Sequence, residues 1–212
     1  MDRRDIQLSA REIASILAPY INVRLSEAQL AQISTYLQAL KKWNEVVPLT
    51  ALEDEAEIVS RHFGESMFGG SVVSMNSGRL ADVGTGAGFP GLALKIVFPG
   101  LEITLIEPNM KKCAFLREVI HNLELKDVEI ARCTYEEFAP SQPWDYICSR
   151  ALGNYKPMLH WSRNFVAPNG RIVLWLGLDD SIAVSKVKNW QWDLPIAVPE
   201  SKRRVILVGR PS

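Results

Sequence analysis

The stretch Asp82-Val83-Gly84-Thr85-Gly86-Ala87-Gly88-Phe89-Pro90-Gly91 decides the fold of this chain. The apolar run Leu80-Ala81 precedes it and the apolar segment 92–97 follows it, which is the order of a strand, a glycine turn and a helix. Glycines at alternate positions allow positive φ and a close approach of the backbone to a bulky ligand. Pro90 suits the first turn of a helix, where its missing N–H is not needed. The stretch therefore predicts a cradle for a nucleotide-like ligand.

Downstream of the glycine turn, segments typical of strands alternate with segments typical of helices. Asn109 is placed to cap one helix, a second helix is expected at 155–164, and a turn is expected at 167–170. The strands are expected at 102–107, 128–131, 144–149 and 171–176, with late strands at 187–192 and 204–208. This alternation predicts a parallel, doubly wound α/β sheet, whose ligands bind at the carboxyl ends of the strands.

Upstream of the glycine turn, the chain has the pattern of helices. Ser9 with Glu12, and Ser26 with Gln29, have the spacing of capping boxes. After Ser26 the apolar residues recur three and four positions apart, which gives one buried stripe. A third helix is expected to begin near Asp54. The first third of the chain is therefore expected to be a helical cap on the sheet.

The length of 212 residues suits one α/β domain with an extension. Residues 71–78 are interpreted as a linker into the first strand. We therefore expect a helical extension at residues 1–77 and a Rossmann-like domain at residues 78–212, packed as one compact unit.

Composition indicates an ordinary globular protein, with 47% hydrophobic residues and 24 basic residues balancing 24 acidic ones. This balance argues neither for nor against nucleic acid, which a local basic patch can bind. No apolar run approaches the ~20 residues of a membrane span, and the charged first residues do not resemble a secretory signal. Cys113, Cys133 and Cys148 have no metal-site spacing and are expected to be buried, reduced thiols. We therefore expect a cytoplasmic protein without a metal site.

Two ligands fit the glycine turn. Gly84-x-Gly86-x-Gly88 is the spacing seen in class I S-adenosylmethionine methyltransferases, whereas 86–91 formally matches the GxGxxG dinucleotide fingerprint. Glu107, at the end of the next strand, suits a ribose hydroxyl in either class. The strand at Trp144, the helix after it and the Pro-Asn-Gly turn resemble the second half of the methyltransferase fold. The short chain also leaves little room for a dinucleotide enzyme's substrate domain, so S-adenosylmethionine is favoured over NAD.

The whole chain resembles one methyltransferase family in collinear motifs. These motifs are Leu40-Lys41-Lys42-Trp43-Asn44 with Leu49-Thr50, Arg61-His62 with Glu65-Ser66, the stretch Asp82–Gly91, Lys111-Lys112 with Phe115-Leu116, Glu136-Glu137-Phe138, and Ser149-Arg150-Ala151. The family is the small-subunit ribosomal RNA methyltransferase G family, also called GidB, which methylates N7 of one guanine in 16S rRNA. Thr85 and Pro90 make the match at the glycine turn more specific than glycines alone.

The resemblance implies a class I fold, S-adenosyl-L-methionine as cofactor, and 16S rRNA or the small ribosomal subunit as partner. We expect the protein to be a monomer, although the sequence has no pattern that determines the oligomeric state. The cofactor contacts that it implies are Gly84, Gly86, Gly88, Phe89, Glu107, Tyr135, Glu136 and Arg150. Arg150 is a candidate catalytic residue, because an arginine that ends an apolar strand should be paired or functional. His62 is the other candidate, because it stands at a position of the family pattern. The alternatives are that Phe89 is core, Glu136 is a solvated acid and His62 is structural.

The chain also departs from the family pattern, mostly on the side expected to face the RNA. Pro48 replaces an asparagine, Leu176 replaces a lysine, Glu65 replaces an aspartate, and Glu107-Pro108 replaces an Asp-Ser pair. Two alternatives therefore stay open. One is a class I methyltransferase with a different RNA or small-molecule target, and the other is a module that binds the cofactor without turnover.

A guanine N7 acceptor would demand little acid–base chemistry from the chain. N7 has a lone pair and no proton, so methyl transfer to it needs orientation and no general base. The chain lacks the motifs of adenine amino-group methylation and of cysteine-dependent cytosine methylation, and Cys148 is interpreted as core. Candidate phosphate contacts are Lys111, Lys112, Arg117 and Lys202-Arg203-Arg204, although charge runs are usually solvated.

Overall fold

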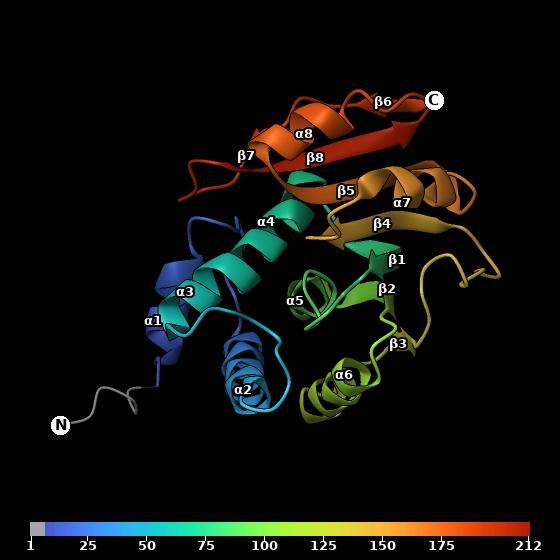
Figure 1. The fold of residues 1–212 in the computed structure, drawn as a ribbon. Helices are drawn as coiled ribbons and strands as arrows, with labels where there is room; N and C mark the ends of the chain where they lie inside the picture. Colours follow the sequence, from blue (N-terminus) through green and yellow to red (C-terminus); the bar gives the residue numbers. More distant parts are fainter. Residues whose placement is uncertain (1–6) are drawn as a thin grey trace.

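The computed structural model describes residues 7–212, so the first six residues of the charged N-terminal segment lie outside the described part. Figure 1 shows a mixed sheet with helices on both faces. The helices are α1 (Ala10–Leu17), α2 (Glu27–Asn44), α3 (Glu55–Ile58), the π-helix η1 (Val59–Gly64), α4 (Glu65–Val72), α5 (Gly91–Val97), α6 (Met110–Asn122), α7 (Tyr155–Ser162) and α8 (Leu178–Val184). The strands are β1 (Ser77–Val83), β2 (Gly100–Ile106), β3 (Val128–Ala131), β4 (Trp144–Arg150), β5 (Val166–Gly177), β6 (Trp190–Trp192), β7 (Ile196–Ala197) and β8 (Arg204–Pro211).

The sheet has the order β3-β2-β1-β4-β5-β8-β6, with β7 paired to β8. The first five strands in this order are parallel, as predicted. The chain leaves β1 toward β2 on one side, while β4 lies on its other side, so the end of β1 is the switch point where such sheets bind ligands. The glycine turn that follows β1 therefore lies at this point.

The predicted parallel pairing ends at the C-terminal edge of the sheet, where β8 runs antiparallel to β5. Only the short α8 and the short strands β6 and β7 separate β5 from β8. The chain therefore returns along β5 in the opposite direction, and β6 and β7 pair antiparallel with β8.

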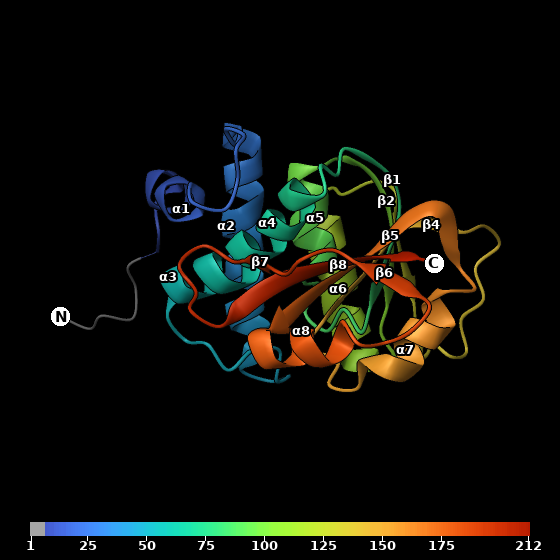
Figure 2. The same cartoon turned by 90° about the horizontal axis from the view of Figure 1, so that it is seen from above.

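The two faces of the sheet bury separate sets of side chains, because successive residues of a strand point to opposite faces. On β1, Leu80 packs on one face and Ala81 on the other, and Val173 and Leu174 divide in the same way on β5. The first face is covered by α2, α4, α5 and α6, and the second by α7 and α8 (Figure 2). Residues of α1, α2 and η1 share the first core with the sheet. The helical extension therefore packs on the sheet, while the boundary between residues 77 and 78 stays a prediction.

The helix starts follow the predicted caps. Ser9 and Ser26 form capping boxes with Glu12 and Gln29, and Asp54 caps α3. The third helix continues through η1 into α4, where the N–H of Glu65 donates to the carbonyl of Ser60 in the wider π pattern. The capping pattern gives no indication of this π segment.

Several details of the elements differ from the predictions. α4 reaches Val72 and β1 begins at Ser77, so the linker is shorter than 71–78. The expected turn at 167–170 lies inside β5 as an irregularity in its pairing with β4. The strand predicted at 187–192 is limited to β6, and α8 was not predicted. Cys113 and Cys148 are buried as expected, whereas Cys133 is only half-buried.

No helix within residues 7–212 is long and apolar enough to cross a membrane.

Tyr36 of α2 ties the extension to the glycine turn, because its hydroxyl donates to the carbonyl of Ala87 in the core. We expect Tyr36→Phe to lower the free energy of unfolding by about 1–3 kcal/mol, because it leaves this buried carbonyl without a donor. Urea unfolding measures the change. The matched control is Tyr146→Phe, which removes a hydroxyl from a half-buried tyrosine of β4 and should change stability by less than about 0.5 kcal/mol. Equal effects of the two variants would contradict the role of Tyr36.

Candidate functional site

The glycine turn between β1 and α5 has the backbone conformation that its glycines predict. Gly84, Gly86 and Gly88 have φ of 70°, 59° and 88°, a region that other residues rarely adopt. The N–H groups of Gly84 and Thr85 both point to the carbonyl of Ile106, at 2.9 and 3.3 Å, which fixes the turn to the end of β2. A Cβ added to Gly86 would meet no protein atom closer than 3.9 Å. The protein therefore leaves open space at Gly86 on the side where a ligand can approach.

The carboxylate of Asp82 holds the two ends of this turn together. Its Oδ2 accepts from Thr85 Oγ1 at 2.5 Å and from the N–H of Gly91 at 2.8 Å, so one oxygen joins both ends of the turn. Asp82 is fully buried, and its Oδ1 has no hydrogen-bond partner. Burial raises the pKa of Asp82 to about 7, against the opposing effects of Thr85 and Gly91. An unpartnered buried oxygen is costly, so this atom points to a proton or a cationic ligand group beside it.

Glu107, directly after β2, faces the same turn. Its Oε2 accepts from the N–H of Gly86 at 3.0 Å and its Oε1 accepts from the N–H of Asn109 at 2.9 Å. Glu107 is buried, with 5% of the residue exposed. Each carboxylate oxygen can accept a second hydrogen bond, so Glu107 can still take two hydroxyl donors. The replacement by Pro108 leaves the cap at Asn109 intact, because Asn109 Oδ1 accepts from the N–H groups of Lys111 and Lys112.

Phe89 lies in an aromatic stack, in line with the alternative that it is core. Its ring is parallel to that of Tyr36 at 5.1 Å and packs against the His62 ring at 4.9 Å and 26°. Phe63 meets both Tyr36 and Phe89 edge to face. Phe89 is therefore buried in this stack, with 7% of the residue exposed.

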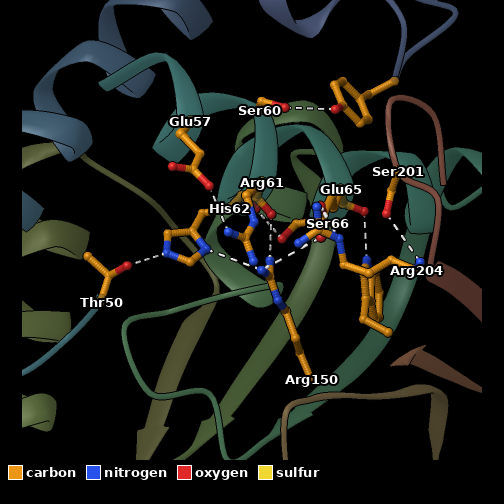
Figure 3. A network of polar contacts seen from close by, with 12 residues as sticks. Thr50, Glu57, Ser60, Arg61, His62, Glu65, Ser66, Arg150, Ser201 and Arg204 are labelled. Atoms are coloured by element: carbon orange, nitrogen blue, oxygen red, sulfur yellow. Dashed lines mark hydrogen bonds and ion pairs between the residues drawn. The ribbon is translucent and has the colours of Figure 1, made fainter. Parts of the chain in front are cut away.

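His62 and Arg150 are in direct contact, as Figure 3 shows. Arg150 Nη2 lies 3.2 Å from His62 Nδ1, and Arg150 Nη1 donates to the carbonyl of Arg61 at 2.9 Å. On the other side of the ring, His62 Nε2 lies 2.7 Å from Thr50 Oγ1. Burial, followed by the charges of Arg150, Arg61 and Arg204, lowers the pKa of His62 to about 3. His62 is therefore neutral near neutral pH.

Glu65 is a buried carboxylate among arginines. Its Oε1 forms an ion pair with Arg204 Nε at 2.8 Å, and its Oε2 lies 3.7 Å from Arg150 Nη2 (Figure 3). Burial raises the pKa of Glu65, whereas the arginines act in the opposite direction. These residues, with Arg61, border a cavity of about 280 Å³ whose wall also includes Trp175 and Leu176. The edge of the site is therefore a hollow lined by three arginines and two carboxylates, Glu65 and Asp180, with an apolar wall.

Tyr135 and Glu136 lie apart from these groups, in the turn after β3. The Tyr135 ring packs edge to face on Trp161 at 5.5 Å, while Glu136 is exposed. Desolvation, and then Glu136, raise the pKa of Tyr135 to about 12. The turn follows the end of β3, where Ala131 accepts from the N–H of Glu107 at 3.0 Å. Both residues thus lie at the ligand-binding edge of the sheet.

The structure adds residues that sequence reasoning missed. Asp82 and Tyr36 support the glycine turn, and Asn44 holds the loop of Thr50 with three hydrogen bonds of 2.8–2.9 Å. Asn44 and Thr50 stood in a motif that could have indicated this role, whereas Tyr36 has only the pattern of a core residue. Pro48 is exposed in the same loop. Leu176 is buried in a core cluster with apolar residues of β5, α7 and α8. Where the family pattern has a lysine, this chain therefore has a core leucine.

The groups around the turn fit S-adenosylmethionine. The open space at Gly86 accommodates a ligand, the free oxygen of Asp82 suits a cation, and Glu107 suits two hydroxyl groups. Within residues 7–212, no group of three or more histidine, cysteine or acidic side chains could hold a metal ion.

Solved methyltransferase structures have a similar fold. A putative O-methyltransferase from Klebsiella pneumoniae superposes with a TM-score of 0.62 at 14% identity, over 84% of this chain and 90% of that one. A ribosomal protein L11 methylase from Lactobacillus delbrueckii subsp. bulgaricus gives 0.61 at 14% identity, over 72% and 79%. At such low identity the likeness concerns the fold alone, and it confirms the predicted class I methyltransferase fold.

Relatives in sequence are closer. The ribosomal RNA small subunit methyltransferase G of Pseudomonas syringae pv. tomato is 34% identical over 196 residues, which is 90% of this chain and 92% of the relative. That of Acetivibrio thermocellus is 34% identical over 181 residues, or 84% and 74%. The family model described as rRNA small subunit methyltransferase G, GidB, matches residues 29–192. The collinear motifs thus predicted the family correctly, and the chain belongs to the rRNA small subunit methyltransferase G (GidB) family.

Proposed function

We propose that this protein is an S-adenosylmethionine-dependent methyltransferase that methylates N7 of a guanine in 16S rRNA. The observation that carries the proposal is the glycine turn at the switch point of the sheet, with Glu107 and the free oxygen of Asp82 beside it. Family membership supports the methyl transfer and the rRNA target.

The residues that would hold the cofactor surround the turn. Glu107 would accept hydrogen bonds from the ribose hydroxyls, and Asp82 would face a positive group of the methionine part. The backbone of the turn at Gly84–Gly88 would lie against the ligand. When bound, S-adenosylmethionine supplies the methyl group from its sulfonium. Tyr135 would border the adenine at the end of β3, and Glu136 would be available to its polar edge. Phe89 would contribute its backbone.

The chain's own contribution to the reaction would be orientation. Guanine N7 needs no deprotonation, so a site without a general base is sufficient, and most of the acceleration would come from holding the ring in line with the methyl group. His62, with its pKa near 3 and its Nδ1 facing Arg150, is unsuited to proton transfer near neutral pH.

The hollow lined by Arg61, Arg150 and Arg204 lies beside this site, and the excess of these arginines over Glu65 and Asp180 suits RNA phosphates. Lys202 and Arg203 precede Arg204, although Arg203 pairs with Asp179 at 2.9 Å. The protein would bind 16S rRNA as free RNA or within the small ribosomal subunit, and it would act as a monomer. A second candidate is a methyltransferase with another RNA or small-molecule target. Leu176, in the wall of this hollow, and Pro48, in the loop of Thr50, favour it because each stands where the family pattern has a polar side chain.

We expect Gly86→Ala to weaken S-adenosylmethionine binding at least about tenfold, because the new Cβ occupies space that the protein leaves open for the ligand. Isothermal titration calorimetry measures the affinity. The matched control is Gly153→Ala, at a glycine with φ of 80° and no atom within 4 Å of its added Cβ. The control has the same type of backbone strain, about 1–2 kcal/mol, and should bind as the wild type does. Unchanged binding by Gly86→Ala would place the ligand elsewhere.

The raised pKa of Asp82 gives cofactor affinity a pH dependence of known sign. In the free protein Asp82 gains a proton as the pH falls through about 7. A cationic ligand group favours the carboxylate, so binding releases this proton and affinity falls below that pH, by up to about tenfold per pH unit. Calorimetry from about pH 7 to about pH 5.5 should show this decline, and Asp82→Asn should bind more weakly without the decline. A constant wild-type affinity over this range would refute the pairing.

Cells lacking the gene should lose one site of aniline cleavage after borohydride treatment of 16S rRNA, the chemical signature of 7-methylguanine. The wild-type gene should restore the site, and Glu107→Ala should not, because it removes the carboxylate beside Gly86. Glu102→Ala, at an exposed position of β2, is the matched control and should restore it. An unchanged cleavage pattern in the deletion strain would exclude the N7 proposal, and the second candidate would then be tested with total RNA and radiolabelled cofactor.

A further inference from the structure

The contact of His62 with Thr50 and Arg150 joins three segments that are far apart in the sequence. Thr50 lies in the loop after α2, His62 in η1, and Arg150 at the end of β4. The ring bridges the other two side chains, with Nε2 at 2.7 Å from Thr50 Oγ1 and Nδ1 at 3.2 Å from Arg150 Nη2 (Figure 3). The helical extension and the edge of the sheet therefore meet through one imidazole ring.

The partners of the ring fix its proton. Arginine can only donate, so His62 Nδ1 must accept from Arg150 and carries no hydrogen. The proton is then on Nε2, which donates to Thr50 Oγ1, while the same oxygen also accepts from the N–H of Leu52 at 3.1 Å. A second proton on His62 would be on Nδ1. This N–H would then face the N–H of Arg150 Nη2, and the hydrogen bond between the two residues would be lost.

The surrounding charges favour the same neutral form. Arg61 of η1, Arg150 of β4 and Arg204 of β8 all lower the pKa of His62, in addition to burial, and Glu65 of α4 is already paired with two of these arginines. The pKa near 3 leaves the ring neutral at any pH at which the protein would act.

The ring itself is held rigidly. It packs on Phe89, the residue that follows the last glycine of the turn. Thr50 is fixed by Asn44, whose Oδ1 accepts from the N–H of Thr50 at 2.9 Å and whose Nδ2 donates to the Thr50 carbonyl at the same distance. Arg150 also donates to the carbonyl of Arg61 in η1. The guanidinium of Arg150 is therefore oriented by the helical extension, and its own strand gives it no hydrogen bond.

We propose that His62 is a positioning residue, which as the neutral Nε2–H tautomer holds the guanidinium of Arg150 at the methyl-transfer site and ties its place to the Thr50 loop. The effect on turnover rests on the proposed function, whereas the tautomer and its contacts do not. A catalytic base at the same place would need the Nδ1 or Nε2 lone pair for substrate, and both nitrogens are already engaged with Arg150 and Thr50.

Two substitutions separate positioning from acid–base catalysis. His62→Asn places a carbonyl oxygen near the former Nδ1, so it can accept from Arg150 but cannot exchange protons near neutral pH. His62→Leu removes both hydrogen bonds. Both variants lose the ring stack on Phe89, so their difference reports on the acceptor. His160→Asn, on the exposed side of α7, is the control. The assay uses radiolabelled S-adenosylmethionine and small ribosomal subunits from cells that lack the gene, and urea unfolding verifies that each variant is folded.

We expect His62→Leu to lower kcat about 100-fold, as a misplaced group does, with less effect on KM. His62→Asn should recover at least about tenfold of this loss, and the control should match the wild type. The pH profile of kcat should contain no pKa in the wild type that is lost in His62→Asn. Equal inactivity of the Asn and Leu variants, or full activity of the Leu variant, would overturn the positioning role.

Nitrogen-15 NMR of the imidazole tests the tautomer without RNA or turnover. We expect the protein labelled at histidine to keep an unprotonated Nδ1 at His62 from about pH 8 to about pH 5, because the pKa lies well below this range, and we expect Arg150→Gln to alter that signal. A protonated Nδ1 would refute the proposal. If the wild type fails to methylate the small subunits, the proposed function fails, and the NMR result still decides whether His62 holds Arg150.

Discussion

The carboxylate of Asp82 is the constraint on which the rest of the site depends. One oxygen binds the Thr85 hydroxyl and the Gly91 N–H, and so it closes a turn whose glycines have positive φ. That turn fixes where β1 ends and where α5 begins, and it exposes the N–H of Gly86 to Glu107. Because Asp82 is fully buried, the interaction is strong and poorly tolerant of loss. Its second oxygen has no hydrogen-bond partner, so the residue that builds the turn also has an unpaired polar atom next to it.

The helical extension is part of the site because it packs on the glycine turn. Tyr36 donates to Ala87 and stacks on Phe89. His62 also packs on the Phe89 ring, and it contacts Arg150. Apolar residues of the extension share one core with the sheet. A change in the extension is therefore expected to reach the cofactor cradle, and the extension and the sheet should unfold together.

The departures from the family pattern are accommodated in different ways. Pro48 is exposed, and the loop around it is held by Asn44, so the loss of an asparagine side chain there does not open the loop. Leu176 is buried in the core of the second face, which replaces a charge by apolar packing. Glu65 reaches both Arg150 and Arg204, and the neighbouring Trp175 donates from Nε1 to the Glu65 carbonyl at 2.6 Å. The arginine-lined hollow thus has an apolar wall formed in part by Trp175 and Leu176.

The sequence by itself determined the sheet class, the glycine turn, the helix caps and the family, because these depend on local backbone preference and on short-range periodicity. It also indicated Glu107 and Arg150 from their places at strand ends. Only the tertiary structure decided that β8 runs antiparallel, that η1 is a π-helix, and that Thr50, His62 and Arg150 meet. Each of these depends on contacts between segments far apart in the chain, and no local pattern records which polar atoms such segments bring within hydrogen-bond distance.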